Sequence, residues 1–202
     1  MAAKPTLGAD MSGKLKNIFG GLVMNQRVML SKKMIKENLI KMLDDNDIYH
    51  ISVRELCRLS GVNRSTFYAH YSSPRDVLLD IEKDVVAGII KIAASSRRGD
   101  LKDHLCAVCR YLYENKELQK IIMRNNTDDD MARALSDAAV SACVPIGYLG
   151  NIDGRDDVDI DFLYTFIDFG MYNVIKKWLM NDIDKTPEQI ADLMGNMIFK
   201  QL

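Results

Sequence analysis

Proline, cysteine and long apolar runs are scarce in this chain of 202 residues. It has 4 prolines and 4 cysteines, and no apolar stretch approaches the roughly 18 residues that a membrane-spanning helix requires. We therefore expect no contact with a membrane. Four unevenly spaced cysteines are too few for a secreted disulfide framework, so reduced thiols and a cytoplasmic location are expected. With 48% hydrophobic and 27% charged residues, the composition is that of a folded globular protein.

The short motifs that mark common enzymes are also absent. The chain contains no GxSxG, GxxxxGK[ST], HExxH or GxGxxG pattern. Cys106 and Cys109 have CxxC spacing, but without a second pair two thiols on a helix face are the better interpretation. A calcium loop centred on Gly154 would place Leu149 and Ile160 where carboxylates are needed. We therefore predict no enzyme activity, no cofactor and no metal site.

Positive charge is concentrated at the front of the chain. Residues 1–71 carry 11 lysines and arginines against 6 acidic residues, a net charge of +5. The remaining residues carry 16 basic against 22 acidic groups, a net charge of −6. A basic segment attracts nucleic acid, and an acidic one is repelled by the phosphate backbone. Any DNA contact is therefore expected in the front part.

Apolar residues recur every three or four positions and strand signals are few, so the sequence predicts an all-α fold. A first helix is predicted from Ser31 to Leu43. The run Ser52–Glu55 has the form of a capping box and starts a short second helix. Gly61 suits a left-handed turn after it, and Asn63 caps another short helix through about Tyr71. Two short helices joined by such a turn form a helix-turn-helix.

Helical patterns also fill most of the chain after this motif. Ser73 and Pro74 start a long helix, with Ser73 as the cap and Pro74 at the first helical position. Later helices are predicted over residues 101–113, 118–125, 129–142, 159–181 and 187–201. We divide the chain into a disordered leader (1–23), a three-helix head (24–72) and a larger helical domain (73–202).

The string from Ser52 to Leu79, SVRELCRLSGVNRSTFYAHYSSPRDVLL, carries the most specific signal in the chain. It combines a hydroxyl cap, a glycine turn, a Thr-x-Tyr-x-His helix and a charged helix start with paired leucines. In these features it closely resembles the helix-turn-helix of the TetR family of bacterial transcriptional repressors. The resemblance implies a homodimer in which residues 24–72 bind DNA and residues 73–202 bind a ligand and dimerise.

The second helix of the motif has the properties that insertion into the major groove demands. Such a helix needs a positive N-terminal end with small or polar outward residues, which the run Asn63–Thr66 supplies. We expect Arg64 to pair with the edge of a guanine. The resemblance implies that Thr66, Tyr68 and His70 position phosphates, which fixes register without reading sequence. The predicted DNA-binding residues are Arg54, Asn63, Arg64, Ser65, Thr66, Tyr68, His70 and Arg75.

Two positions depart from the family pattern. Pro74 stands where the family usually has a phosphate-gripping lysine, so we assign that role to Arg75. Cys57 replaces a common alanine and is expected to be buried as a small hydrophobe. A redox role for it is the lesser alternative, because thiol reactivity requires exposure and a lowered pKa. Phe67 and Tyr71 lie four residues apart and are expected to face inward.

The two C-terminal helices are predicted to form a four-helix dimer interface with their symmetry mates, as the resemblance also implies. The helix over residues 159–181 has two adjacent apolar rows, a stripe wider than one core face requires. Gly170 and Gly195 weaken helix propensity, so a close approach of helices is expected to compensate. The predicted interface residues are Phe166, Gly170, Val174, Trp178, Ile190, Met194, Met197 and Ile198.

A regulator of this kind is expected to hold a small-molecule effector between the helices of its second domain. The candidates are polar or soft side chains on otherwise apolar helices, although aromatic and methionine residues at helical spacing are mostly plain core. They are His104, Cys109, Tyr113, Met123, Tyr164, Tyr172 and Asn173.

The sequence thus predicts a sequence-specific DNA-binding regulator, a repressor released from a palindromic operator by an effector. Its expected partners are double-stranded DNA, a second copy of the chain and the effector. Two alternatives stay open: an adaptor of the same fold that acts through a protein partner, and a small-molecule carrier or enzyme without DNA function. The polar surface from Arg64 to His70 separates them, because a carrier does not need it.

Overall fold

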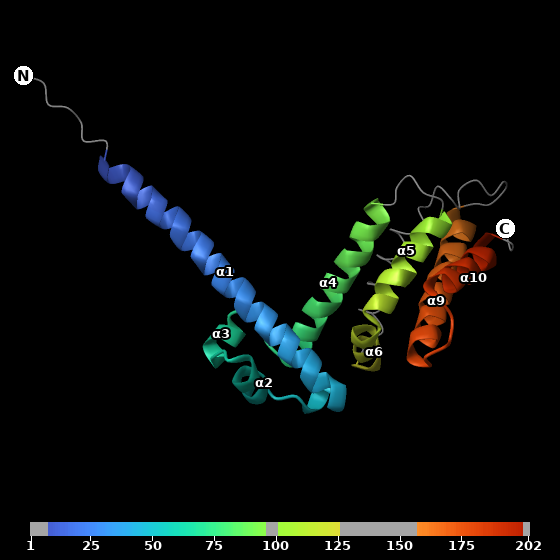
Figure 1. Ribbon diagram of the computed structural model, residues 1–202, viewed down its shortest axis with the longest axis horizontal. Helices are drawn as coiled ribbons and strands as arrows, with labels where there is room; N and C mark the ends of the chain where they lie inside the picture. Colours follow the sequence, from blue (N-terminus) through green and yellow to red (C-terminus); the bar gives the residue numbers. More distant parts are fainter. Residues whose placement is uncertain (1–7, 96–100, 126–156, 200–202) are drawn as a thin grey trace, which may run out of the picture. The chain divides into compact units, whose positions relative to one another are not determined.

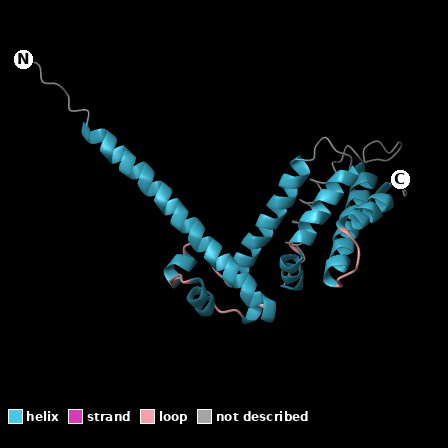
Figure 2. Cartoon of the chain, in the orientation of Figure 1, coloured by secondary structure: helices cyan, strands magenta, loops and turns pink. Residues whose placement is uncertain are grey.

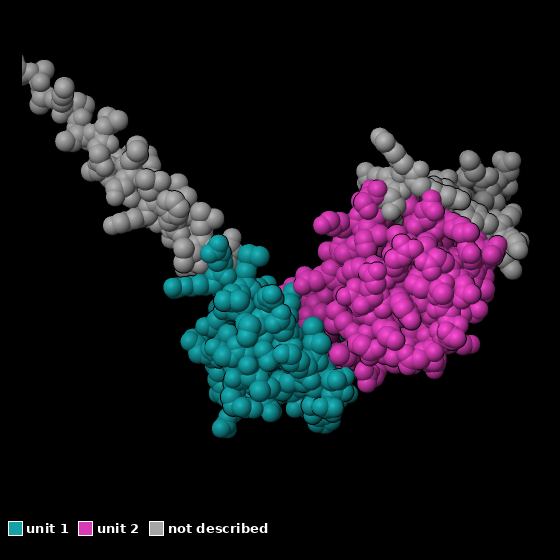
Figure 3. Space-filling model, in the orientation of Figure 1, with its two compact units in different colours: residues 1–77 teal, residues 78–202 magenta. Residues whose placement is uncertain are grey.

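The computed structural model describes residues 8–95, 101–125 and 157–199, and every element in these ranges is helical (Figure 1, Figure 2). The all-α prediction is therefore confirmed. Two compact units divide the chain, residues 1–77 and residues 78–202 (Figure 3). The helix predicted over residues 129–142 and the acidic loop around Gly154 lie outside the described residues.

Helix α1 runs without interruption from Gly8 to Asp45. It begins far before the predicted start at Ser31 and includes most of the segment 1–23 that the sequence analysis assigns to a leader. The chain has no proline between Pro5 and Pro74, so no residue in this segment forbids a helix to continue. Each glycine of the segment weakens a helix by about 1 kcal/mol, a cost that a helix tolerates. The glycines nevertheless hide the helical pattern of the segment in the sequence.

Unit 1 is a three-helix head in which α1 packs on α2 (Val53–Ser60). A 3₁₀ turn, η1 (Ile48–His50), follows α1, and the short helix α3 (Arg64–Tyr68) follows α2. Apolar side chains from all these elements are withdrawn from water and hold the head together. The buried residues are Ile35, Leu39, Leu43, Ile48, Ile51, Leu56, Cys57, Phe67, Tyr71 and Val77.

Unit 2 is a helical bundle. Helix α4 (Pro74–Ser95) enters it from unit 1, and α5 (Leu101–Glu114), α6 (Lys116–Asn125), α9 (Asp157–Met180) and α10 (Pro187–Phe199) complete its described part. Helix α5 packs along α10, while α9 contacts both α6 and α10 (Figure 1). An ion pair of 2.7 Å between Arg110 Nη2 and Glu188 Oε1 joins α5 to the start of α10.

Four residues predicted for the dimer interface lie instead in the core of unit 2. Trp178 is only 2% exposed, and Ile190, Met194 and Ile198 are also buried. Helix α10 turns this face toward α5 of its own chain. The Trp178 indole N–H donates to the backbone oxygen of Lys185 at 3.0 Å, which satisfies the polar end of a buried ring. These four side chains are therefore buried within the protomer itself.

The Arg110–Glu188 pair predicts a defined dependence of stability on pH. The hydrogen bond from Arg110 lowers the pKa of the Glu188 carboxyl to about 2, below the roughly 4.3 of an unfolded glutamate. The pair therefore stabilises the fold above that unfolded value, and its contribution is lost as the pH falls toward 2. We expect Glu188→Gln to unfold at a lower urea concentration than the wild type at pH 7, with the gap much narrower at pH 2.5.

Far-UV circular dichroism at the two pH values measures this gap. Asp161→Asn is the matched control, because Asp161 is an exposed carboxylate on α9. A gap for Glu188→Gln that stays constant between pH 7 and pH 2.5 would show that the ion pair does not contribute to stability.

Candidate nucleic-acid interface

The first helix of the motif, α2, starts at a side-chain cap. Ser52 has extended backbone angles, and its Oγ accepts the backbone N–H of Glu55 at 3.2 Å. This cap satisfies one of the N–H groups that a helix start leaves without an internal partner. Leu56 and Cys57 then point into the head, while Arg54 and Arg58 are exposed. The capping prediction for Ser52 is confirmed.

The turn after α2 depends on Gly61, which has φ 66° and ψ 22°. Its N–H and that of Val62 both donate to the backbone oxygen of Cys57, so this carbonyl near the end of α2 accepts two bonds in the turn. A side-chain carbon placed on Gly61 would meet no atom within 4 Å. Glycine is therefore required here by the left-handed backbone and not by lack of space.

Helix α3 starts at Asn63, as the sequence predicts. Its Oδ1 accepts the backbone N–H of Thr66 at 2.7 Å and the hydroxyl of Ser65 at 2.8 Å. The α-helix ends at Tyr68, earlier than the predicted Tyr71. The N–H of His70 bonds to the oxygen of Phe67 at 2.9 Å, a three-residue step that tightens the last turn and closes the helix.

Two aromatic residues attach α3 to the head. Phe67 is fully buried and Tyr71 nearly so, which confirms that they face inward. Their ring centroids lie 5.9 Å apart. Lys32 of α1 places its ammonium 5.2 Å from the centroid of the Tyr71 ring, a cation–π contact that the sequence did not reveal. Only the fold brings residues 39 positions apart together, so no local signal marks this pair.

The predicted DNA-binding side chains are exposed or half-buried. Tyr68 is 58% exposed, and its ring meets the edge of Phe67 at 5.5 Å, which fixes the direction of its hydroxyl. Arg54, on α2, and Asn63, Arg64 and Ser65, at the start of α3, are exposed, while Thr66, His70 and Arg75 are half-buried. The structure thus gathers six of the eight residues in the segment 63–70 and leaves Arg54 on α2 and Arg75 on α4.

Arg75 is held at the start of α4 by a second cap. The hydroxyl and backbone N–H of Ser72 donate to the Asp76 carboxylate, and the Asp76 N–H donates to Ser73 Oγ at 3.2 Å. The hydrogen bonds from Ser72 keep the pKa of Asp76 below its ordinary value, so the carboxylate stays charged. This reciprocal arrangement fixes the chain on both sides of Pro74, and with it the backbone of Arg75.

Cys57 lies directly behind this surface. Its side chain is buried as predicted, and burial raises the pKa of the thiol despite the opposing effect of Arg64. A protonated, buried thiol is a poor nucleophile. The described ranges also contain no cluster of three or more histidine, cysteine, aspartate or glutamate side chains suited to a metal ion.

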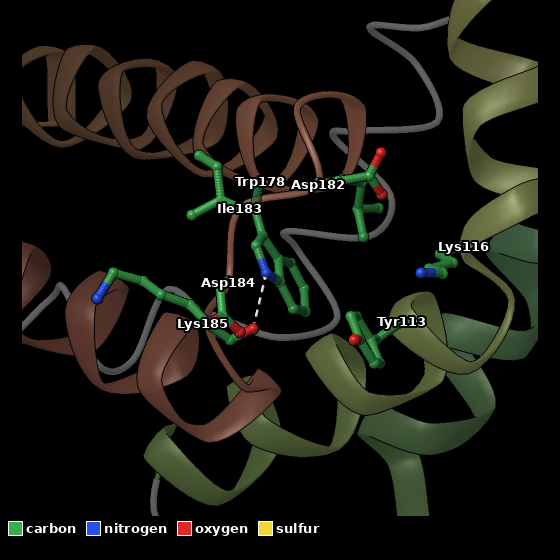
Figure 4. Close-up of a pocket in the computed structure, with 8 residues that line it drawn as sticks. Tyr113, Lys116, Trp178, Asp182, Ile183, Asp184 and Lys185 are labelled. Carbon is green, nitrogen blue, oxygen red and sulfur yellow. Dashed lines mark hydrogen bonds between the residues drawn. The ribbon is translucent and has the colours of Figure 1, made fainter.

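The predicted effector-binding residues of unit 2 differ in their exposure. His104 and Cys109 are buried in α5, whereas Asn173 is exposed and donates to the oxygen of Phe169 at 2.7 Å. Met123, Tyr164 and Tyr172 are half-buried. Tyr113 lines a cleft of about 130 Å³ in the described part of the chain (Figure 4). The cleft residues are Tyr113, Lys116, Trp178, Leu179, Asp182, Ile183, Asp184 and Lys185.

A comparison with known protein families shows to which family this chain belongs. The family TetR_C_8, described as a transcriptional regulator C-terminal region, matches residues 99–200, half of the chain. The chain belongs to the TetR family of transcriptional regulators. This family is non-enzymatic, and its members are DNA-binding regulators with a helix-turn-helix. In the described residues of this TetR regulator, no helix is long and apolar enough to cross a bilayer.

Two curated proteins are similar in sequence. The HTH-type transcriptional repressor AcnR of Corynebacterium diphtheriae is 21% identical over 184 residues, which are 88% of this chain and 96% of AcnR. The uncharacterized HTH-type transcriptional regulator YxbF of Bacillus subtilis is 30% identical over 61 residues. That second match covers 30% of this chain and 16% of the length of YxbF.

Two solved structures share the fold of this TetR regulator. A TetR regulator from Streptococcus agalactiae superimposes with a TM-score of 0.68 at 21% identity, over 88% of this chain and 98% of that one. Thermus thermophilus FadR, a TetR-family repressor in complex with lauroyl-CoA, gives a TM-score of 0.57 at 16% identity, over 85% and 94%. At these identities the likeness establishes the fold alone.

The turn geometry predicts a stability cost at one position. Gly61→Ala should lower the free energy of unfolding by about 1 kcal/mol, because a Cβ disfavours the left-handed conformation. Gly61→Asn should cost less, since asparagine tolerates this backbone. Urea titration followed by circular dichroism measures both. Equal stability of Gly61→Ala and the wild type would mean that the turn has another backbone conformation.

Proposed function

We propose that this TetR regulator is a cytoplasmic repressor that binds a palindromic operator as a homodimer and is released by a small-molecule effector. The observation that carries the proposal is the surface of α3, where Arg64 and Tyr68 project into solvent while Phe67 is fully buried. Repression is supported by AcnR and Thermus thermophilus FadR, both of which are named repressors. Residues 24–72 bind DNA, and residues 73–202 dimerise and bind the effector.

Each head inserts α3 into the major groove, and the two heads of a dimer meet successive grooves about 34 Å apart. Arg64 reads a base edge, while Thr66, Tyr68 and His70 contact phosphates. The oxygen of the Asn63 side chain is occupied by the helix cap, so its amide NH₂ is the group that faces the duplex. Arg54, Ser65 and Arg75 complete the phosphate contacts.

Two substitutions separate base reading from phosphate binding. Arg64→Ala should cost about 1–3 kcal/mol of operator binding and relax the preference at one base pair. Tyr68→Phe should weaken binding to all sequences alike, because it removes one phosphate contact. Fluorescence anisotropy with the intergenic DNA beside its own gene, with single-base variants of it and with a scrambled duplex measures both effects at two salt concentrations.

Lys41→Ala is the matched control, because Lys41 is an exposed cation of α1 outside the helix-turn-helix. It should leave base preference unchanged. If Arg64→Ala and Tyr68→Phe both bind operator as tightly as the wild type, α3 does not enter the groove as proposed. Equal binding of wild type to the operator and the scrambled duplex would contradict sequence-specific regulation.

The dimer interface that we propose lies on the faces of α9 and α10 that the protomer leaves exposed. Phe162 and Phe166 of α9 are 70% and 74% exposed, and Phe169, Leu193 and Met197 are exposed as well. Monomeric proteins rarely leave so many large apolar side chains in water. A side-chain carbon on Gly170 would meet no atom within 4 Å, so this face of α9 has room for a close neighbour from a second copy. Phe166, Gly170, Val174 and Met197 remain from the sequence-based set.

The double substitution Phe166→Ser and Met197→Ser should convert the dimer to monomers, since it removes apolar area that a partner covers. Sedimentation equilibrium at micromolar concentration measures the mass. Ile90→Ser is the control, because Ile90 is an exposed apolar residue of α4. A wild-type protein that sediments as a monomer would refute the proposed dimer.

An effector in unit 2 is supported by two observations. The structure of Thermus thermophilus FadR contains lauroyl-CoA. Within this chain, Glu82, His104 and Asp168 are buried in unit 2 on three different helices. Charged side chains are rarely buried without polar partners, so this interior has more polar groups than a plain apolar core.

A further inference from the structure

The outward side of α2 carries two exposed arginines, Arg54 and Arg58, which lie four residues apart. Residues at this spacing share one face of a helix and are separated by about 6 Å along its axis. Leu56 and Cys57, which lie between them in the sequence, are buried in the head. The two guanidinium groups therefore form one positive edge of the helix-turn-helix.

Both ends of α2 hold this edge in place. The cap at Ser52 fixes the start of the helix, and the left-handed turn at Gly61 fixes its end. Helix α1 packs on α2 within the head. The backbone that carries Arg54 and Arg58 is therefore fixed, while their side chains extend into solvent.

A carboxylate lies beside the second arginine. Glu55 Oε1 is 4.0 Å from Arg58 Nη2, and the two side chains are 54% and 70% exposed. Exposed ion pairs of this kind contribute little to stability, because water and salt screen them. Among the described residues, Arg58 forms an ion pair with Glu55 alone, and Arg54 forms none. The positive charge of the edge is therefore only weakly neutralised within the protein.

The position of this edge in the motif suits a contact with the DNA backbone. In a helix-turn-helix, the first helix crosses the backbone while the second enters the major groove. Each strand carries one negative charge per about 3.4 Å of duplex axis, so two cations about 6 Å apart can meet neighbouring phosphates. A guanidinium group donates two parallel hydrogen bonds to a phosphate, whereas a carboxylate is repelled by it.

We propose that Arg54 and Arg58 together bind the phosphates of one operator strand, and that Glu55 competes with the DNA for Arg58. The sequence pattern of the motif does not indicate Arg58. On binding, Arg58 exchanges the Glu55 carboxylate for a phosphate, and Glu55 stays beside the negatively charged strand. The pair therefore sets how tightly the head binds any duplex without changing which bases it reads. This inference rests on the proposed function, because it requires a head that binds DNA.

The salt dependence of binding tests the contact of Arg58. Each neutralised phosphate steepens the plot of log affinity against log salt concentration by about 0.9, and a dimer carries the contact twice. Arg58→Gln should therefore flatten the plot by about 1.8 and weaken binding roughly sixtyfold at about 0.1 M salt. The loss should be equal for the intergenic DNA and a scrambled duplex, because phosphates carry no sequence. Arg58→Lys keeps the charge and should keep the slope.

Fluorescence anisotropy of the full-length protein between about 50 and 200 mM salt measures these slopes. Urea titration followed by circular dichroism shows that each variant is folded. Lys41→Gln, which removes an exposed cation of α1, should leave the slope of the wild type unchanged.

Glu55→Gln tests the competition for Arg58. Glutamine keeps the capping role of this position near the start of α2 and removes the charge. Both duplexes should bind more tightly, by about two- to fivefold for each head of the dimer. The gain should shrink when Arg58→Gln is also present, because the carboxylate then has no arginine to pair with. Glu37→Gln is the matched control, since Glu37 forms an exposed ion pair of 3.8 Å with Lys33 on α1.

Four outcomes would overturn these expectations. A wild-type slope for Arg58→Gln refutes the phosphate contact, and a loss confined to the intergenic DNA overturns it too, because Arg58 would then read a base. A gain from Glu55→Gln that is equal with and without Arg58 refutes the competition. Wild-type protein that binds neither duplex refutes the proposed function itself, whereas wild-type binding with unaffected Arg58 and Glu55 variants refutes this inference alone.

Discussion

A helix of five residues cannot hold its shape in water, so the surface that we propose to face DNA depends on the burial of Phe67. This side chain fixes α3 against the rest of the head, and Tyr71 with Lys32 holds the chain that leaves α3. The outward-pointing residues of α3 are then not needed to hold the helix in place. The same short helix therefore has one face that sets its position and another that is available for a duplex.

The helix-turn-helix could be predicted in detail because its signals are local. Ser52, Gly61 and Asn63 each act within four residues of themselves, through a cap, a backbone angle and a second cap. The early start of α1 could not be predicted, because it depends on the absence of a stop signal and not on the presence of a start. The contact of Lys32 with Tyr71 depends on the assembled head, and no spacing in the sequence reveals it.

In unit 2 the sequence showed that α9 and α10 are amphipathic but not which apolar row each helix turns inward. Ile190, Met194 and Ile198 lie in the core because α10 packs along α5 of its own chain, and Trp178 of α9 stacks on Tyr113 of α5. Phe162 and Phe166, which lie more than three turns before Trp178 in the same row of α9, are left in water. The width of an apolar stripe indicates how much surface must be covered. Only the packing of the helices shows which element covers it.

Two of the ion pairs of the described bundle hold the turn between α9 and α10 in place. Arg110 with Glu188 ties α5 to the start of α10, and Lys120 with Asp182 ties α6 to the end of α9. The turn between α9 and α10 is thus held at both ends, and the Trp178 indole N–H donates to its Lys185 backbone oxygen. Because α9 and α10 also present the exposed apolar faces proposed for dimerisation, these links fix the elements that the proposed dimer uses.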